Sequence, residues 1–479
     1  MNLLFITADQ QRWDSLPCYG LDFMQTPNLD RLAREGMVFE RCYVPAPLCV
    51  PTRAALMCGQ WPSATGVLSN LNWLGEGKLP VWPQVLTDAG YDTAAIGKMH
   101  FFPWDARNGF QERISAEDKR HTYLPDDFSK FLQAHGHRRA HPTQNPGYFD
   151  TLNASVTPLP KRFHVDGFIG DQAADWLARN GKEPFAVWVS FAGPHDPYDP
   201  PEEMADMYYD APIPAPVGSR AELANKPRAQ QQAGKENLKN SMYRMSPAEA
   251  TPEQHRMWRA HYYANISLID EEVGKMLAAL EANGVLDETL IIYTADHGDA
   301  LGDHGLPYKG FYYESMAHVP LIIRGPGVAG GSRCPALVSS LDYVPLFYTT
   351  CSLEPPDTLQ SRSLAPLLAD PTLPHRDIVF SENMGSQMVR DARYKYAHYA
   401  TGESELYDLE TDPDEIENLA QSRAHADVIS HLRGLLVAHN LQNHAYQSAA
   451  LARPQEPFRV KLEEAYTVED AYTEQASTR

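Results

Sequence analysis

The chain has 479 residues, of which 43% are hydrophobic and 10% aromatic, and its formal net charge is −21. Such a chain can bury one large core and a smaller one, so the totals exclude a disordered protein. The acidic balance argues against nucleic acid and anionic membranes as partners, because both require a basic protein surface. No run of about 18 apolar residues occurs, so the sequence predicts no membrane-spanning helix.

The opening residues, Met1 to Asp9, lack the basic region and the long apolar region of a secretory signal peptide. We interpret them as a core strand of a cytoplasmic protein. The six cysteines form no CxxC pair and no dense framework, so neither structural disulfides nor a zinc ribbon is expected. Most of the cysteines are predicted to be buried thiols.

Buried strands alternate with helical patterns along most of the chain. The predicted strands are 3–7, 93–96, 185–191, 290–294 and 320–323, and the predicted helices include 28–35, 82–89 and 169–180. The clearest helix begins with Thr251 as its N-cap and ends at Asn283-Gly284. This alternation predicts an α/β sheet with helices on both faces.

The pattern changes in the last quarter of the chain. Short amphipathic strands are predicted at 378–380, 386–389, 394–398 and 405–408, followed by helical turns near Ile416 and from 426 to 440. We therefore predict a large domain at 1–360 and a small α+β domain with an antiparallel sheet at 361–479, ending in a frayed tail at 474–479. Within the large domain, the polar stretches 105–143 and 219–241 are predicted to be long connections, the second a mobile flap.

Two pairs of polar residues stand where predicted strands end. Asp9 and Gln10 follow the first strand, and Asp296 and His297 follow the strand at 290–294. If these strands are neighbours, the four side chains converge beyond their carboxyl ends, where open α/β sheets bind ligands. An oxygen-rich set with one imidazole suits Ca²⁺ or Mn²⁺ better than a structural zinc. The alternative is that each aspartate only caps the next helix.

Cys49 lies just before a predicted short helix that runs from Pro51 to Cys58 and stops at Gly59. The positive N-terminal end of a helix favours an anion, so a thiolate nucleophile at Cys49 is one interpretation. A small buried hydrophobic side chain is the commoner use of a free cysteine. A thiol is also a poor match for the hard, oxygen-rich metal set.

Five cationic or proton-carrying groups lie after predicted strands or in the loops that follow them. Taken singly, each is more often an exposed lysine or a loop histidine. Together they indicate a local positive cluster that binds an anion in an otherwise acidic protein. The five residues are Arg53, Lys98, His100, His195 and Lys309.

From Asp9 to Lys309, the order of these groups resembles the type I sulfatases of the alkaline phosphatase superfamily. Their motif is usually written C-x-P-S-R with a glycine six residues after the arginine, and here it is Cys49-Val50-Pro51-Thr52-Arg53 followed by Gly59. Thr52 replaces the commoner serine. The resemblance implies a large mixed, mostly parallel sheet flanked by helices, with a smaller C-terminal domain that carries an antiparallel sheet.

The resemblance also implies a role for each group. A formylglycine-generating enzyme would convert Cys49 to formylglycine, whose hydrate supplies a hydroxyl nucleophile on one divalent ion, Ca²⁺ or Mn²⁺. Its ligands would be residue 49 together with Asp9, Gln10, Asp296 and His297. Arg53 would hold the formylglycine, and the sulfate oxygens would be bound by Lys98, His195 and Lys309. His100 would deprotonate the second hydroxyl to release sulfate, and His195 or Lys309 would protonate the leaving oxygen.

The predicted function is hydrolysis of a sulfate monoester, aryl or another small organic sulfate. The alternative is a phosphonate monoester or phosphodiester hydrolase with the same nucleophile; such enzymes tend to lack the pair that Lys98 and His100 form here. A lesser alternative is an unmodified anion-binding pseudoenzyme. The tail from about Gln442 is longer than the small sheet needs, and we predict that it packs on a neighbouring subunit in a homo-oligomer.

Overall fold

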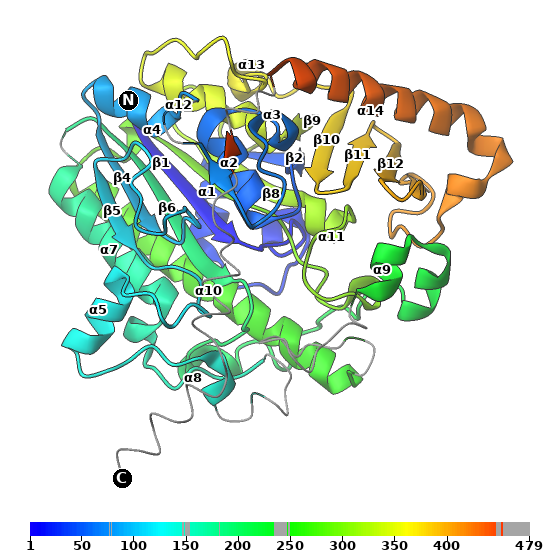
Figure 1. The fold of residues 1–479 in the computed structure, drawn as a ribbon. Helices are drawn as coiled ribbons and strands as arrows, with labels where there is room; N and C mark the ends of the chain where they lie inside the picture. The colour runs from blue at the N-terminus through cyan, green and yellow to red at the C-terminus, as the bar shows by residue number, and fades with distance from the viewer. Residues whose placement is uncertain are drawn as a thin grey trace.

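The computed structural model describes residues 1–75, 77, 79–145, 148, 154–181, 183–233, 247, 250–446 and 452–453. An eight-stranded sheet forms its centre, in the order β5-β4-β6-β1-β7-β8-β2-β9 (Figure 1). Only β8 runs antiparallel to its neighbours, so the sheet is mixed and mostly parallel, as predicted. The strands are β1 (Asn2–Asp9), β2 (Met37–Tyr43), β4 (Asp92–Gly97), β5 (Glu112–Ser115), β6 (Phe185–Pro194), β7 (Thr289–Ala295), β8 (His318–Arg324) and β9 (Ser332–Ser339).

Helices cover both faces of this sheet, because its central strands are apolar on both sides. In β1, Leu4 and Ile6 pack in one core with helices α1, α7 and α10, whereas Leu3 and Phe5 pack in a second core with α2, α4 and α12. Figure 1 shows α7 and α10 on the opposite side of the sheet from α4 and α12. The bounds of these helices are α1 (Pro27–Glu35), α2 (Cys49–Cys58), α4 (Trp82–Asp88), α7 (Val165–Asn180), α10 (Pro252–Ala282) and α12 (Val344–Thr350).

The longest helix, α10, begins as its sequence predicts. The Thr251 side chain accepts from the backbone N–H of Gln254, and the Gln254 side chain accepts from the backbone N–H of Thr251. This reciprocal capping satisfies donors that a helix start leaves unpaired. At the other end of the helix, the predicted stop at Asn283-Gly284 is also confirmed, with Asn283 as the C-cap.

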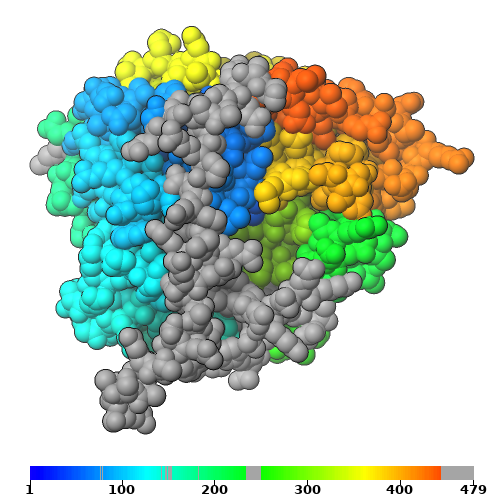
Figure 2. Space-filling model, viewed as in Figure 1, coloured from blue at the N-terminus to red at the C-terminus, as the bar shows by residue number. Residues whose placement is uncertain are grey.

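A smaller antiparallel sheet follows, with the strand order β10-β11-β12-β13. Its strands are β10 (Val379–Asn383), β11 (Ser386–Arg390), β12 (Tyr394–Tyr399) and β13 (Ser404–Asp408), and the long helix α14 (Ala426–Tyr446) packs on it. Figure 2 shows this region, in gold and orange, directly beside N-terminal residues drawn in blue. The Glu382 backbone N–H donates to Pro45 O over 2.7 Å across this junction. The predicted boundary at residue 360 stays a prediction.

Two predicted connections contain regular structure. The stretch 105–143, predicted as a long connection, holds the edge strand β5 and a helix, α5 (Asp127–Ala134), neither of which was predicted. In the stretch 219–241, helix α9 (Arg228–Gln232) docks on the small sheet, and the buried Lys226 donates to Tyr407 Oη over 2.9 Å. This described part is therefore packed rather than free, and residues 234–241 lie outside the described residues.

The far C-terminus contributes one short strand, β14 (Ala452–Arg453), which pairs with β3 (Trp73–Leu74). The predicted frayed tail, and most of the segment predicted to pack on another subunit, lie outside the described residues, so oligomerisation stays a prediction. No helix within the described ranges is both long enough and apolar enough to cross a membrane.

Candidate active site

The ends of two neighbouring central strands form the base of the site. Strands β1 and β7 are parallel and in register, with Ala8 opposite Ala295, so Asp9 and Asp296 emerge side by side. The backbone N–H of Gln10 donates to Asp296 Oδ1 over 3.1 Å and fixes the two strand ends together. The prediction that these strands are neighbours is confirmed.

Helix α2 brings Cys49 over these strand ends. Cys49 is the first residue of α2, and every side chain of this helix is buried. Its Sγ lies 3.1 Å from His297 Nε2, 3.0 Å from Lys309 Nζ and 3.9 Å from Asp9 Oδ1. Burial alone would raise the pKa of the Cys49 thiol, but the charges of Lys309 and His297 lower it well below its usual value. The position therefore favours an anionic oxygen or sulfur.

Four of these side chains form a set that can hold a cation. Ligand atoms of Asp9, Cys49, Asp296 and His297 all lie within 4.8 Å of one another. His297 Nε2 is 3.8 Å from Asp9 Oδ1 and 3.6 Å from Asp296 Oδ1. Adjacent ligands of one Ca²⁺ ion are themselves about 3.2–3.7 Å apart, so this spacing fits a shared divalent cation.

The orientation of each donor supports the same fit. His297 Nδ1 lies 2.9 Å from Gly298 O and can donate to it, which turns Nε2 toward the centre. Burial and the charge of Lys309 act against it, but the charges of Asp296 and Cys49 raise the pKa of His297, so Nε2 must lose its proton before it can bind a cation. The Gln10 side chain donates from Nε2 to Asp299 Oδ2 over 2.6 Å and turns its Oε1 toward Lys309, 2.7 Å away.

Arg53 occupies the opposite side of the two carboxylates. Its Nε donates to Asp296 Oδ2 over 2.9 Å and its Nη2 to Asp9 Oδ2 over 3.1 Å. Both carboxylates thus present one oxygen to Arg53 and the other to the centre of the site. Because the guanidinium is fully buried and its charge is permanent, Arg53 offsets the charge of the two carboxylates and fixes their orientation.

Lys98 is held between two carboxylates at the end of β4. Its Nζ is 2.9 Å from Asp9 Oδ2 and 2.9 Å from Asp118 Oδ2, and its side chain is 1% exposed. Burial lowers the pKa of this lysine, but the charges of Asp118 and Asp9 outweigh burial and raise it. The ammonium therefore stays charged inside the protein.

The two histidines each carry a ring nitrogen without a partner among the described residues, namely His195 Nε2 and His100 Nδ1. His195 Nδ1 lies 2.7 Å from Asp196 O, so the ring proton lies on Nδ1. Burial, together with the charges of Lys309 and Lys98, lowers the pKa of His195 to about 3, which keeps the ring neutral. Both imidazoles contact the Cys49 thiol. All ten predicted site residues therefore converge, although their roles remain predictions.

Sequence reasoning missed several residues around the site. Asp118 pairs with Lys98 and accepts two bonds of 2.6 Å from Arg120, Asp299 anchors Gln10, and Asn70 accepts from the Val50 backbone over 3.0 Å. A signal existed for Asp118, because it closely follows a strand that ends at the same edge as β4. That strand, β5, is short and polar, so it was interpreted as part of a loop.

The fold is of the α/β class, and it brings Cys49, Asp9, Asp296 and His297 together at the carboxyl ends of neighbouring strands. The family model described as sulfatase matches residues 1–350. A second, described as N-sulphoglucosamine sulphohydrolase, C-terminal, matches residues 302–442. The chain therefore belongs to the sulfatase family, which confirms the predicted resemblance and the enzyme class, a hydrolase acting on sulfuric ester bonds.

Named relatives cover most of the chain. The choline-sulfatase of Rhizobium meliloti is 32% identical over 438 residues, spanning 88% of this chain and 82% of the relative. The arylsulfatase of Clostridium perfringens is 29% identical and covers 91% of this chain and 93% of its own. Among solved structures, the phosphonate monoester hydrolase of Agrobacterium radiobacter superposes with a TM-score of 0.80 at 26% identity, covering 95% of this chain and 100% of that chain.

Proposed function

We propose that the protein hydrolyses a sulfate monoester, aryl or another small organic sulfate. In this proposal Cys49 is converted to formylglycine and one divalent cation, Ca²⁺ or Mn²⁺, binds residue 49, Asp9, Gln10, Asp296 and His297. The observation that carries it is the position of Cys49, which lies within reach of both the cation ligands and the ammonium of Lys309. The other ligands are mostly hard oxygen donors. Such a set suits an oxygen at position 49 better than the sulfur of a thiol.

When bound, the cation lowers the pKa of a coordinated hydroxyl, and formylglycine supplies that hydroxyl as a hydrate. The chain's own residues supply the rest of the chemistry. Lys98 and Lys309 direct ammonium protons at the site, where they stabilise charge that develops on sulfate oxygens. Arg53 orients Asp9 and Asp296. His100, next to position 49 with Nδ1 unpaired, would accept the proton of the second hydroxyl as sulfate leaves and the aldehyde re-forms.

The contacts support one of the two candidates for protonating the leaving oxygen. His195 carries its proton on Nδ1, which faces Asp196 O, so its Nε2 presents a lone pair to the site. Lys309 presents a charged ammonium on the open side, where its side chain is 13% exposed. This arrangement favours Lys309 as the proton donor and His195 as a neutral group beside the nucleophile.

A phosphonate monoester or phosphodiester is the second candidate substrate. It is supported by the likeness to the phosphonate monoester hydrolase of Agrobacterium radiobacter. The two candidates are separated by kcat/KM for 4-nitrophenyl sulfate and for 4-nitrophenyl phenylphosphonate on one preparation. We expect the sulfate to be preferred, because phosphonate monoester hydrolases tend to lack a pair like the one that Lys98 and His100 form here. A preference for the phosphonate would contradict the first proposal.

Peptide mass spectrometry across Cys49 tests whether the nucleophile exists. We expect the mass of an aldehyde in place of the thiol, and loss of all turnover in Cys49→Ala with an unchanged melting temperature. Cys58→Ala is the matched control, since it removes a buried thiol of the same helix whose Sγ lies 3.3 Å from Ala54 O. An intact thiol with no turnover of any ester would favour the anion-binding pseudoenzyme instead.

A further inference from the structure

The loop that carries Lys309 is joined to the small sheet as well as to the segment after β7, where the Ala300 N–H donates to Tyr308 O. Asn383 Nδ2 donates to Gly310 O over 3.0 Å, and Lys395 Nζ donates to Tyr312 O over 2.8 Å. Residues 309–312 belong to no helix or strand. Across the described residues, no backbone hydrogen bond joins 309–312 to the large sheet. The position of this backbone therefore depends on side chains from β10 and β12.

An ion cluster closes the far end of the same loop. Lys395 Nζ lies 2.7 Å from Glu314 Oε1 and 2.6 Å from Glu415 Oε1, and the backbone N–H of Glu314 donates to Glu415 Oε2 over 2.7 Å. The Lys395 side chain is 2% exposed. Because a buried charge is costly unless it is paired, this cluster has one favourable arrangement and holds the start of helix α11 (Glu314–Ala317) in place.

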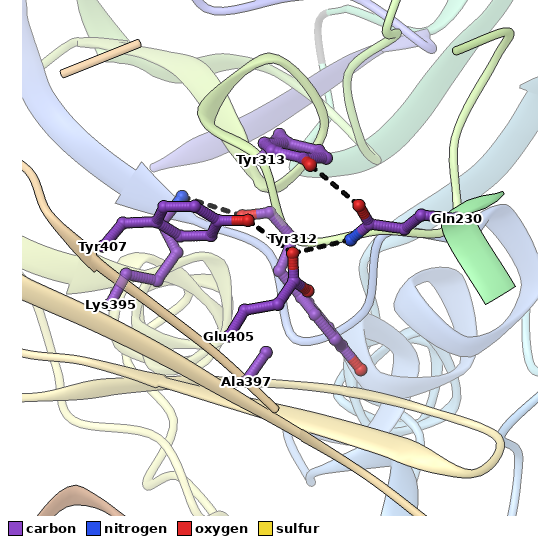
Figure 3. A pocket seen from close by; sticks show the side chains of 7 residues that line it. All are labelled: Gln230, Tyr312, Tyr313, Lys395, Ala397, Glu405 and Tyr407. Carbon is purple, nitrogen blue, oxygen red and sulfur yellow. Dashed lines mark hydrogen bonds between the residues drawn. The ribbon is translucent and has the colours of Figure 1, made fainter. Parts of the chain in front are cut away.

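Packing around the cluster is tight. Figure 3 shows Lys395 pointing at Tyr312, with Gln230 bridging Tyr313 and Glu405. The Gln230 side chain accepts from Tyr313 Oη over 2.8 Å and donates to Glu405 Oε1 over 2.7 Å. The cavity among these side chains measures only about 10 Å³, which is room for one water molecule at most. This region is therefore a rigid support and not a ligand pocket.

We propose that Asn383 and Lys395 are positioning residues that set the place of the Lys309 ammonium. The inference rests on the proposed function and extends it to the C-terminal sheet. Lys309 Nζ must stay 3.0 Å from the side chain at position 49 and 2.7 Å from Gln10 Oε1. Its backbone neighbour, Gly310, is the residue that Asn383 holds. A shift of this peptide moves the ammonium, and small misplacements of a group at a reacting centre lower the rate strongly.

Hydrogen exchange tests the attachment without any need for activity. In Asn383→Ala, the amides of residues 309–313 should exchange about tenfold faster or more than in the wild type, because the loop opens locally. Met384→Ala is the control, since Met384 lies on the same turn and is 67% exposed. Tyr312→Phe, which loses the 2.9 Å contact of Tyr312 Oη with Ser386 Oγ, should give a smaller increase. Unchanged exchange in Asn383→Ala would overturn the inference.

A double-mutant cycle tests whether the effect passes through Lys309. We expect Asn383→Ala to lower kcat about tenfold with little change in KM, and Asn383→Gln to recover part of the loss. In a Lys309→Ala background, Asn383→Ala should cost nothing further. Full additivity of the two losses would show that Asn383 acts on stability alone and would overturn the positioning role. A wild type without turnover would contradict the proposed function, and the exchange result would still decide the attachment.

Discussion

Lys98, at the candidate active site, and Lys395, in the small sheet, are two buried lysines with closely similar surroundings. Lys98 lies 2.9 Å from Asp9 and 2.9 Å from Asp118, while Lys395 lies 2.7 Å from Glu314 and 2.6 Å from Glu415. Both are almost fully buried between two carboxylates. By charge and burial alone, the two clusters cannot be told apart.

The difference lies in what surrounds each cluster. Around Lys395, the carboxylates also meet a backbone N–H and the Tyr43 hydroxyl, which donates to Glu314 Oε2 over 2.6 Å. Around Lys98, one oxygen of Asp9 faces a centre that it shares with ligand atoms of Cys49, Asp296 and His297. A set of ligand atoms grouped around one point, rather than buried charge, marks the candidate active site.

The largest expected effect comes from the ligand set, which only the first cluster possesses. Removal of divalent ions should reduce turnover to background, and Ca²⁺ or Mn²⁺ should restore it. The ion should also stabilise the fold by about 2.7 kcal/mol at a hundred times its Kd. Asp296→Asn should abolish both responses in thermal unfolding and activity assays. Asp287→Asn, at a side chain that is 91% exposed, is the control. A melting temperature that neither Ca²⁺ nor Mn²⁺ changes would contradict the proposed cation site.

Matched substitutions of the two lysines should differ most in their effect on stability. Lys98→Met should lower kcat/KM by about 10²-fold or more, because it removes a charge aimed at the reacting group. It should lower the free energy of unfolding only slightly, because Asp9 stays paired with Arg53 and Asp118 stays paired with Arg120. Lys395→Met should destabilise by about 3–5 kcal/mol in urea unfolding, because it leaves buried carboxylates short of a cation. Equal losses of stability in Lys98→Met and Lys395→Met would contradict the distinction drawn between the two clusters.

The smallest effect should come from a buried carboxyl outside both clusters. Glu272 is 1% exposed and its pKa is raised from 4.5 to about 7 by burial, against the opposing charge of Lys275. Between these two values the folded state binds a proton that the unfolded state has released. Stability from this group is therefore present below pH 4.5 and is lost as the pH rises through 7.

Urea unfolding at several pH values measures this loss. Glu272→Gln should flatten the slope between pH 4.5 and 7. Glu271→Gln is the matched control, because the neighbouring Glu271 side chain is 45% exposed. A slope that persists in Glu272→Gln would assign the titration to another group.

Local signals were enough to predict the floor of the site. Asp9 and Asp296 follow apolar runs, and neighbouring parallel strands end at one edge of a sheet, so their meeting could be expected. The end of α2 at Gly59 was predictable too, but the helix begins at Cys49, two residues before the predicted start at Pro51. The placement of Lys98 and His195 followed from the strands that precede them.

The missed parts depend on contacts between distant segments. Strand β2 carries Glu40 and Arg41 where its register shifts, and β9 contains Pro335, so neither has the alternating pattern of a strand. The cluster around Lys395 joins residue 314 to residue 415, and no local pattern pairs such positions. Asp118 was missed because β5 has four residues and only one is buried.

The burial of α2 has a consequence for the order of events in biosynthesis. All ten residues of this helix are covered, and Cys49 is only 1% exposed. A second protein needs several residues of extended chain to grip a side chain and alter it, and the finished fold offers none here. If position 49 is converted as proposed, the conversion belongs to the interval between synthesis and closure of the core. In that case, a molecule that folds before conversion keeps a buried thiol. The active fraction of a preparation would then report how many chains were converted before they folded.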